Sequence, residues 1–120
     1  MNIATKLEKA AKLIEDRGLT YGVLEMPETG EVCMLGAIQR VAKPKGQLSY
    51  PTVRNKAVYW AAEAIKQTVH DAITFGDDQS VVFLWNDGGG VDESGTLIRR
   101  TPQEAAAMLR KAAKLYREQA

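Results

Sequence analysis

Three segments of this chain repeat apolar residues at the spacing of an α-helix, and this pattern constrains the fold more than any other feature. They span residues 2–17, 52–73 and 101–118. In each segment the apolar side chains recur every three or four positions, and most of the charged residues occupy the positions between them. Each helix therefore has one face to bury, and the faces can be buried only against one another or against further elements.

The ends of the first and last helices are marked by residues that cap helices. Thr101-Pro102-Gln103-Glu104 is a capping box with proline at the first helical position, a combination typical of a helix start. Asn2 is a candidate N-cap for the first helix, and Gly18 is placed to follow its last turn, where glycine is favoured.

A shorter apolar periodicity predicts a fourth helix over residues 33–42. Leu35, Ile38 and Val41 share one face of this helix. Gly36 lies beside that face, and its missing side chain would let another backbone approach closely.

The run Ser80–Trp85 is almost wholly apolar, so periodicity alone fits either a buried strand or a short helix. Asp77 and Asp78 precede it, and an aspartate at that point favours a helix because it can cap the first turn. The β-branched Val81 and Val82 favour a strand instead.

Between the first two helices, Pro27 and Gly30 mark a turn with apolar residues on both sides. This pattern allows a short β-hairpin near residues 21–35, which would have to pack on the helices to be stable. The predicted fold is therefore mainly α: a compact bundle of four or five helices with this hairpin as its one β element. The length fits a single globular domain over residues 1–120.

The composition argues against several classes of protein. The net charge is +1, so no overall field attracts nucleic acid or anionic lipid. One cysteine and one histidine are too few for a Cys/His zinc site and allow no internal disulfide, which suits a reducing cytoplasm. No apolar run approaches the roughly 20 residues of a membrane span, and the charged amphipathic N-terminus does not resemble a signal peptide. We expect a cytoplasmic protein of a bacterial host cell, with no cofactor, no metal and no membrane contact.

The first candidate site is Trp85-Asn86-Asp87, which is followed by three glycines. Asn and Asp side chains bond to nearby backbone groups, and glycines allow positive φ. Two interpretations are open: a binding site that presents polar groups beside exposed backbone, or a turn that ends a helix and is held by its own side chains.

A second candidate site is a catalytic set of Cys33, His70 and either Asp87 or Asn86, which occur in the order used by papain-like hydrolases. A helix start near Cys33 would lower the pKa of the thiol. Against this stands the ordinary role of a free cysteine as a small buried apolar residue. A catalytic role is therefore the less favoured interpretation, and an enzyme is not expected.

A third candidate site is basic. Residues 40–56 carry five positive side chains and no acid, and Arg40, Lys43 and Lys45 could contact phosphates. The acidic segment 77–93 could neutralise this stretch within one chain or across a homodimer. Nucleic acid is thus an alternative partner, although not the favoured one.

Three short motifs occur in one order along the chain: Cys33-x-Leu35-Gly36-Ala37, Trp85-Asn86-Asp87 and Thr101-x-x-Glu104. In this pattern the chain resembles an uncharacterised family of small proteins from actinobacteria and their phages. It departs from that family in a longer glycine loop, residues 88–100. The resemblance implies a phage or prophage accessory protein and supplies no catalytic residues. Together with the balanced charge, it predicts a module that binds a host or phage protein, with Trp85, Asn86 and Asp87 as candidate binding residues.

Overall fold

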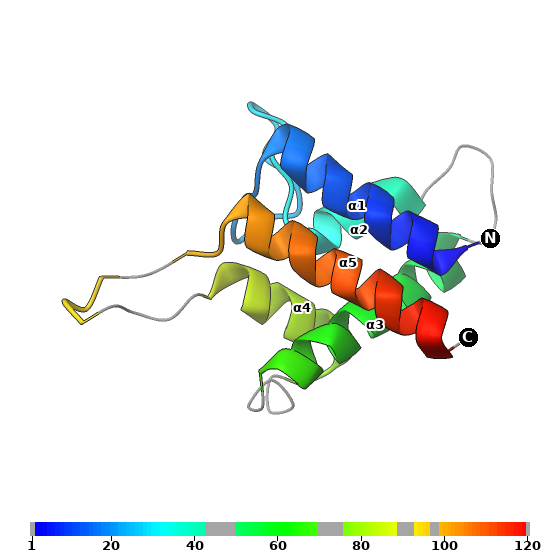
Figure 1. Cartoon of the computed structure of the whole chain (residues 1–120). Coiled ribbons are helices and arrows are strands. Elements are labelled where there is room, and N and C mark those ends of the chain that lie inside the picture. The colour runs from blue at the N-terminus through cyan, green and yellow to red at the C-terminus, as the bar shows by residue number, and fades with distance from the viewer. Residues whose placement is uncertain (1, 43–49, 70–75, 89–92, 97–98, 120) are drawn as a thin grey trace.

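The computed structural model describes residues 2–42, 50–69, 76–88, 93–96 and 99–119, and within these ranges five helices pack around one hydrophobic core (Figure 1). The predicted mainly α fold is confirmed. The helices are α1 (Ile3–Arg17), α2 (Met34–Ala42), α3 (Tyr50–Thr68), α4 (Asp78–Asp87) and α5 (Pro102–Gln119).

The most extensive packing is between α1 and α5, the first and last helices, which run side by side in opposite directions (Figure 1). Both helices bury several alanines, and small side chains let helix axes approach closely. The helix α3 packs on α5 and α4, and α2 packs on α1. The buried alanines of α1 and α5 are Ala4, Ala10, Ala11, Ala105, Ala106, Ala112 and Ala113.

The predicted helix ends are confirmed at both of these helices. The Asn2 side chain accepts a hydrogen bond from the Thr5 N–H at 3.3 Å. Gly18 ends α1 with a φ of 93°, a conformation that glycine adopts at little cost. At the start of α5, Thr101 and Glu104 each accept a hydrogen bond from the other's backbone N–H, at 3.1 and 3.0 Å.

The ambiguous run Ser80–Trp85 is helical and belongs to α4. The Asp77 side chain caps this helix by accepting a hydrogen bond from the Ser80 N–H at 2.8 Å. The preference for a helix over a strand is therefore confirmed, and the local capping signal outweighed the β-branched residues. The helix α3 begins two residues before the predicted start, and the predicted residues 70–73 lie outside the described ranges.

The segment between α1 and α2 does not form the two strands of the hairpin suggested near residues 21–35. Its described backbone has only isolated bridges, in which Val32 pairs with Leu19 in parallel and with Glu25 in antiparallel orientation. A single antiparallel bridge forms, in which the Cys33 N–H donates to the Leu24 carbonyl at 3.1 Å and the Met26 N–H donates to the Glu31 carbonyl at 2.8 Å. The pairing does not extend further because the next donor, the Met34 N–H, bonds to Asn86 Oδ1 at 2.9 Å and Met34 begins α2. The segment is an irregular loop that lies against the start of α2.

Candidate functional site

Asn86, at the end of α4, lies where three segments meet, and its side chain is only 1% exposed. Its Oδ1 accepts the backbone N–H of Met34, the first residue of α2, at 2.9 Å. Its Nδ2 donates to the Thr20 carbonyl at 3.1 Å and to Asp87 Oδ1 at 3.0 Å. Both amide donors and the acceptor are used, so this side chain ties the loop to two helices.

Asp87 holds the same loop from its exposed side. Its two carboxylate oxygens accept the Gly22 N–H at 3.1 and 3.0 Å. Gly22 has a φ of 77°, which favours glycine at this point. We call the set of Thr20, Gly22, Met34, Asn86 and Asp87 the polar junction.

A backbone contact next to the polar junction fixes the loop further. A Cβ placed on Gly36 would lie 1.9 Å from the Leu24 carbonyl oxygen, far inside the distance that real Cβ atoms keep. The close backbone approach predicted at Gly36 is confirmed. The loop is therefore held at three successive points: Thr20, Gly22 and Leu24.

Trp85, the residue before Asn86 on α4, is buried in the core. Arg100 Nε donates to the Trp85 carbonyl at 3.0 Å, and the guanidinium carbon lies 4.1 Å from the indole centroid, a cation–π arrangement. The Tyr21 hydroxyl donates to the Arg100 carbonyl. Sequence reasoning missed Arg100, and its only local signal is its place beside the capping box of α5.

The structure places Cys33 in the core, just before α2. Burial raises the pKa of the thiol, and hydrogen bonds from the Gly36 and Leu35 backbone offset this only in part. The suggested lowering of the pKa by the helix start is therefore wrong at this position, because desolvation outweighs it. The charge of Asp87 also raises this pKa, and His70 lies outside the described residues.

Of the basic candidates, Arg40 is exposed and pairs with Glu25 at 2.9 Å, whereas Lys43 and Lys45 lie outside the described residues. On α5, Arg110 and Arg117 make bidentate hydrogen bonds to Glu15 and Glu8 of α1, at 2.6 to 3.0 Å. The positive charge of these three arginines is thus already matched by carboxylates.

The basic stretch 40–56 and the acidic stretch 77–93 meet at one point: Arg54 of the first lines the same cavity as Asp77 and Asp78 of the second. Asp78 pairs with Lys66 of α3 at 3.5 Å. One basic and two acidic residues from the two stretches are therefore neighbours within a single chain.

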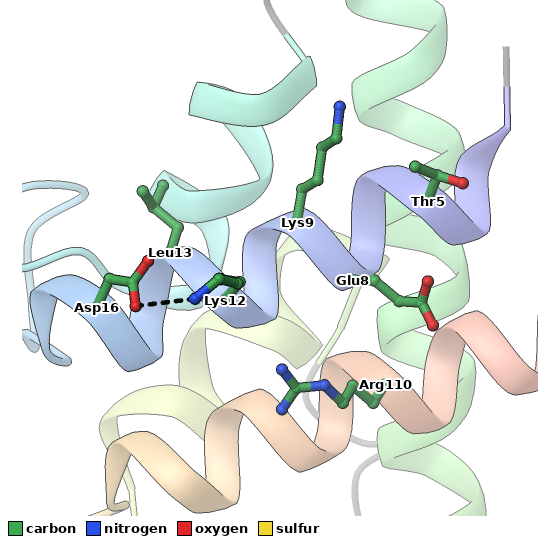
Figure 2. Close-up of a pocket in the computed structure, with 7 residues that line it drawn as sticks. All are labelled: Thr5, Glu8, Lys9, Lys12, Leu13, Asp16 and Arg110. Atoms are coloured by element: carbon green, nitrogen blue, oxygen red, sulfur yellow. Dashed lines mark hydrogen bonds and ion pairs between the residues drawn. The ribbon is translucent and has the colours of Figure 1, made fainter.

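A cavity of about 420 Å³ lies along α1 (Figure 2). All its lining side chains except Arg110 come from α1, and Figure 2 shows them spread along the helix rather than converging on one point. Lys12 pairs with Asp16 at 3.3 Å, and Arg110 is held by Glu15. Glu8 is paired with Arg117, so every charged group of this cavity except Lys9 is in an ion pair within the described part of the protein.

A different surface is apolar and was not predicted from the sequence. Val23 and Leu24 are 46% and 44% exposed in the loop, and Phe83 and Leu84 are exposed on α4. Leu24, Leu35 and Phe83 line a cavity of about 290 Å³, which we call the Leu24–Phe83 groove. Its polar lining residues are Asp77, Gln79 and Ser80. The one sequence signal is the apolar run Val81–Trp85, because a helix cannot turn five consecutive residues toward one core.

Two further findings apply to the described ranges. No cluster of three or more His, Cys, Asp or Glu side chains there could hold a metal ion. No described helix is both long enough and apolar enough to cross a lipid bilayer.

The packing and the polar junction define a class: a small α-helical protein in which a buried asparagine fixes an exposed loop. The model of a family of unknown function, DUF6197, matches residues 1–115, and the chain belongs to this family. No curated protein and no solved structure matches the chain. Membership of an uncharacterised family is confirmed, while the actinobacterial or phage origin stays a prediction.

Proposed function

We propose that this protein is an interaction module that binds a protein partner at the Leu24–Phe83 groove and the adjoining Val23. One observation carries the proposal: the polar junction and Gly36 fix the backbone of a loop whose apolar side chains remain in water. Full burial of such a side chain stabilises by about 1.5–3 kcal/mol. Because the loop is already ordered, partner binding would regain this energy without a large entropic cost.

The chemistry of the groove indicates the kind of partner. Its lining is half apolar, from Leu24, Leu35 and Phe83, and half polar, from Asp77, Gln79 and Ser80. The hydrogen bond from the Ser80 backbone N–H lowers the pKa of the Asp77 carboxyl, so this group is ionised at neutral pH. A segment with an apolar anchor next to a Lys or Arg side chain matches this arrangement. On the resemblance described above, the partner is a host or phage protein and the module a cytoplasmic phage or prophage accessory protein.

The alternatives have less support. Arg40, Arg110 and Arg117 are engaged by carboxylates, which weakens a nucleic-acid interface. Cys33 is buried with a raised pKa, which weakens a thiol-dependent hydrolase.

The test is a pull-down from host lysate with nuclease added, read by mass spectrometry. The double variant Leu24→Ala/Phe83→Ala should lose a partner that the unchanged protein retains. Tyr59→Ala is the matched control, because Tyr59 is also 44% exposed but lies on α3 outside the groove. Thermal unfolding would confirm that both variants are folded. Equal retention by the groove variant, or a partner lost only after nuclease treatment, would contradict the proposal.

A further inference from the structure

A second groove shares no lining residue with the Leu24–Phe83 groove and is therefore independent of the proposed partner surface. It has a volume of about 410 Å³, within the range of sites for small molecules. Its apolar lining includes Val69, Trp85 and Met108, and its charged lining is Arg100, Glu104 and Lys111. We call it the Trp85–Lys111 groove.

Three elements build this groove. Positions 104, 108 and 111 of α5 are three or four residues apart and therefore share one helix face. The end of α3 contributes Thr68 and Val69. The almost buried Trp85 of α4 completes the apolar lining.

Arg100 brings unused hydrogen-bonding capacity to this groove. Its side chain is only 22% exposed, and Nε is taken by the Trp85 carbonyl. The nearest charged partner of its terminal nitrogens is Glu104, at 3.8 Å, which is beyond hydrogen-bond distance. Among the described residues those terminal nitrogens have no hydrogen bond. Burial lowers the pKa of this guanidinium, and the charge of Glu104 raises it only in part.

Lys111 supplies a second cation at the groove. Its Nζ donates to Thr68 Oγ1, and an ammonium group has three donors. The opposing carboxylate, Glu104, already accepts the Thr101 N–H through Oε1. Two cations and one partly occupied carboxylate therefore border an apolar surface.

We propose that the Trp85–Lys111 groove binds a small carboxylic acid with an apolar body. The carboxylate accepts hydrogen bonds from Arg100 and Lys111, a charge-assisted arrangement that is stronger than one between neutral groups. The apolar body packs on Val69 and Ala107 and on the small exposed parts of Trp85 and Met108. A neutral molecule of the same shape would leave the Arg100 donors without an anionic partner, so the charge of the ligand decides its affinity.

The test uses the fluorescence of Trp85. The chain has two tryptophans, so Trp60→Phe leaves Trp85 as the sole reporter. Titration with 3-phenylpropionate should change the emission saturably, and a Kd of about 1 mM would correspond to roughly −4 kcal/mol. The neutral amide of the same acid should bind at least about tenfold more weakly. Isothermal titration calorimetry on the unchanged protein gives a second readout that does not depend on emission.

Paired variants locate the site. Lys111→Met keeps the apolar stem and removes the charge, and it should weaken binding of the acid by about tenfold. Lys114→Met is the matched control, since Lys114 is exposed on the same helix and does not line the groove. Equal affinity for the acid and the amide, equal affinity of the two variants, or no saturable binding by either method would overturn the proposal. The double variant Leu24→Ala/Phe83→Ala should bind the acid normally, which separates this test from that of partner binding.

Discussion

The polar junction can be compared with the two ion pairs Arg110–Glu15 and Arg117–Glu8, which join α5 to α1 and which we call the rim. Both regions use hydrogen bonds of similar length in different surroundings. At the rim, Arg117 reaches Glu8 at 2.9 to 3.0 Å, across 109 positions of sequence. At the junction, Asn86 reaches Met34 at 2.9 Å across 52 positions. The rim groups are exposed, and water can replace each partner; at Asn86 no water is available. Burial, rather than distance or charge, therefore sets what each contact contributes to stability.

The two regions also differ in what they hold in place. The rim borders two helices whose buried alanines already fix their packing. The polar junction fixes an irregular loop, in which Val23 and Leu24 face the solvent. Loss of a rim contact should leave the fold intact, whereas loss of a junction contact should release the loop.

The largest effect is expected from Gly36→Ala. The new Cβ would meet the backbone oxygen of Leu24 at 1.9 Å, and backbone must then move rather than a flexible side chain. We expect the free energy of unfolding to fall by at least about 3 kcal/mol, the upper end of overpacking effects. Urea unfolding followed by circular dichroism measures this change. Gln39→Ala in the same helix is the control, and a Gly36→Ala protein as stable as that control would show that the loop is not held here.

Asn86→Ala is expected to have the second largest effect on stability. It leaves the buried Met34 N–H and Thr20 carbonyl without this side-chain partner, which should lower the free energy of unfolding by about 2–3 kcal/mol. Asn55→Ala, which removes an exposed asparagine of α3, should change it little. If both variants lost a similar free energy of unfolding, burial would not explain the difference between the polar junction and exposed contacts.

Asp87→Ala should have a smaller effect on stability and a clear one on the loop. The Gly22 N–H that it releases is exposed, so water can replace the carboxylate there. The Asn86 Nδ2 also loses one acceptor but keeps its bond to the Thr20 carbonyl, and we expect a loss of about 1–2 kcal/mol. Amide hydrogen exchange at Gly22 should nevertheless become faster, and partner retention in the pull-down should fall. Asp87→Asn keeps one acceptor oxygen, so its exchange rate at Gly22 should lie between those of Asp87→Ala and the unchanged protein. Unchanged exchange at Gly22 would show that Asp87 does not order the loop.

The smallest effect on stability is expected from substitutions of the rim carboxylates Glu8 and Glu15, and this effect depends on pH. Hydrogen bonds from Arg117 and Arg110 lower the pKa values of Glu8 and Glu15 below their ordinary value of 4.5. A lowered pKa in the folded state means that these pairs stabilise the protein above pH 4.5 and that this contribution is lost as the pH falls through the folded-state values. The variant Glu8→Gln/Glu15→Gln should therefore show a flatter fall of melting temperature below pH 4.5.

Salt offers an independent check on the rim, because exposed ion pairs are screened. Added salt should reduce the difference between the Glu8→Gln/Glu15→Gln variant and the unchanged protein. Asp16→Asn is the control, since Asp16 pairs only with Lys12 of its own helix among the ion pairs described. A pH profile unchanged by the double substitution would show that the rim pairs contribute nothing to stability.

The helices were predictable because their signals are local. Asn2, Gly18, Asp77 and the Thr101–Glu104 box each act within four residues of where they stand. The Asp77 cap is such a local signal, and it allowed α4 to be recognised as a helix despite its β-branched residues. The hairpin did not extend beyond one antiparallel bridge because the Met34 N–H bonds to Asn86, 52 positions away, which no local turn signal reveals.

The candidate site was only partly predictable. The sequence drew attention to Trp85, Asn86 and Asp87 but left a binding role and a structural role equally open. The structure gives Asn86 a complete set of protein partners and places the exposed apolar surface at Val23, Leu24 and Phe83 instead. Arg100 was missed because its significance depends on the Trp85 ring, 15 positions away.

The sequence by itself determined where the helices lie, how they are capped and that Gly36 admits a second backbone, since these properties follow from a few neighbouring residues. Only the tertiary structure decided that Asn86 is buried, that Asp87 reaches Gly22 across 65 positions, and that two apolar side chains are held in water. The physical reason is that burial is a property of the packed chain. An amide or a carboxylate has the same chemistry in a buried and in an exposed position. Its contribution to stability changes only when packing removes the water around it.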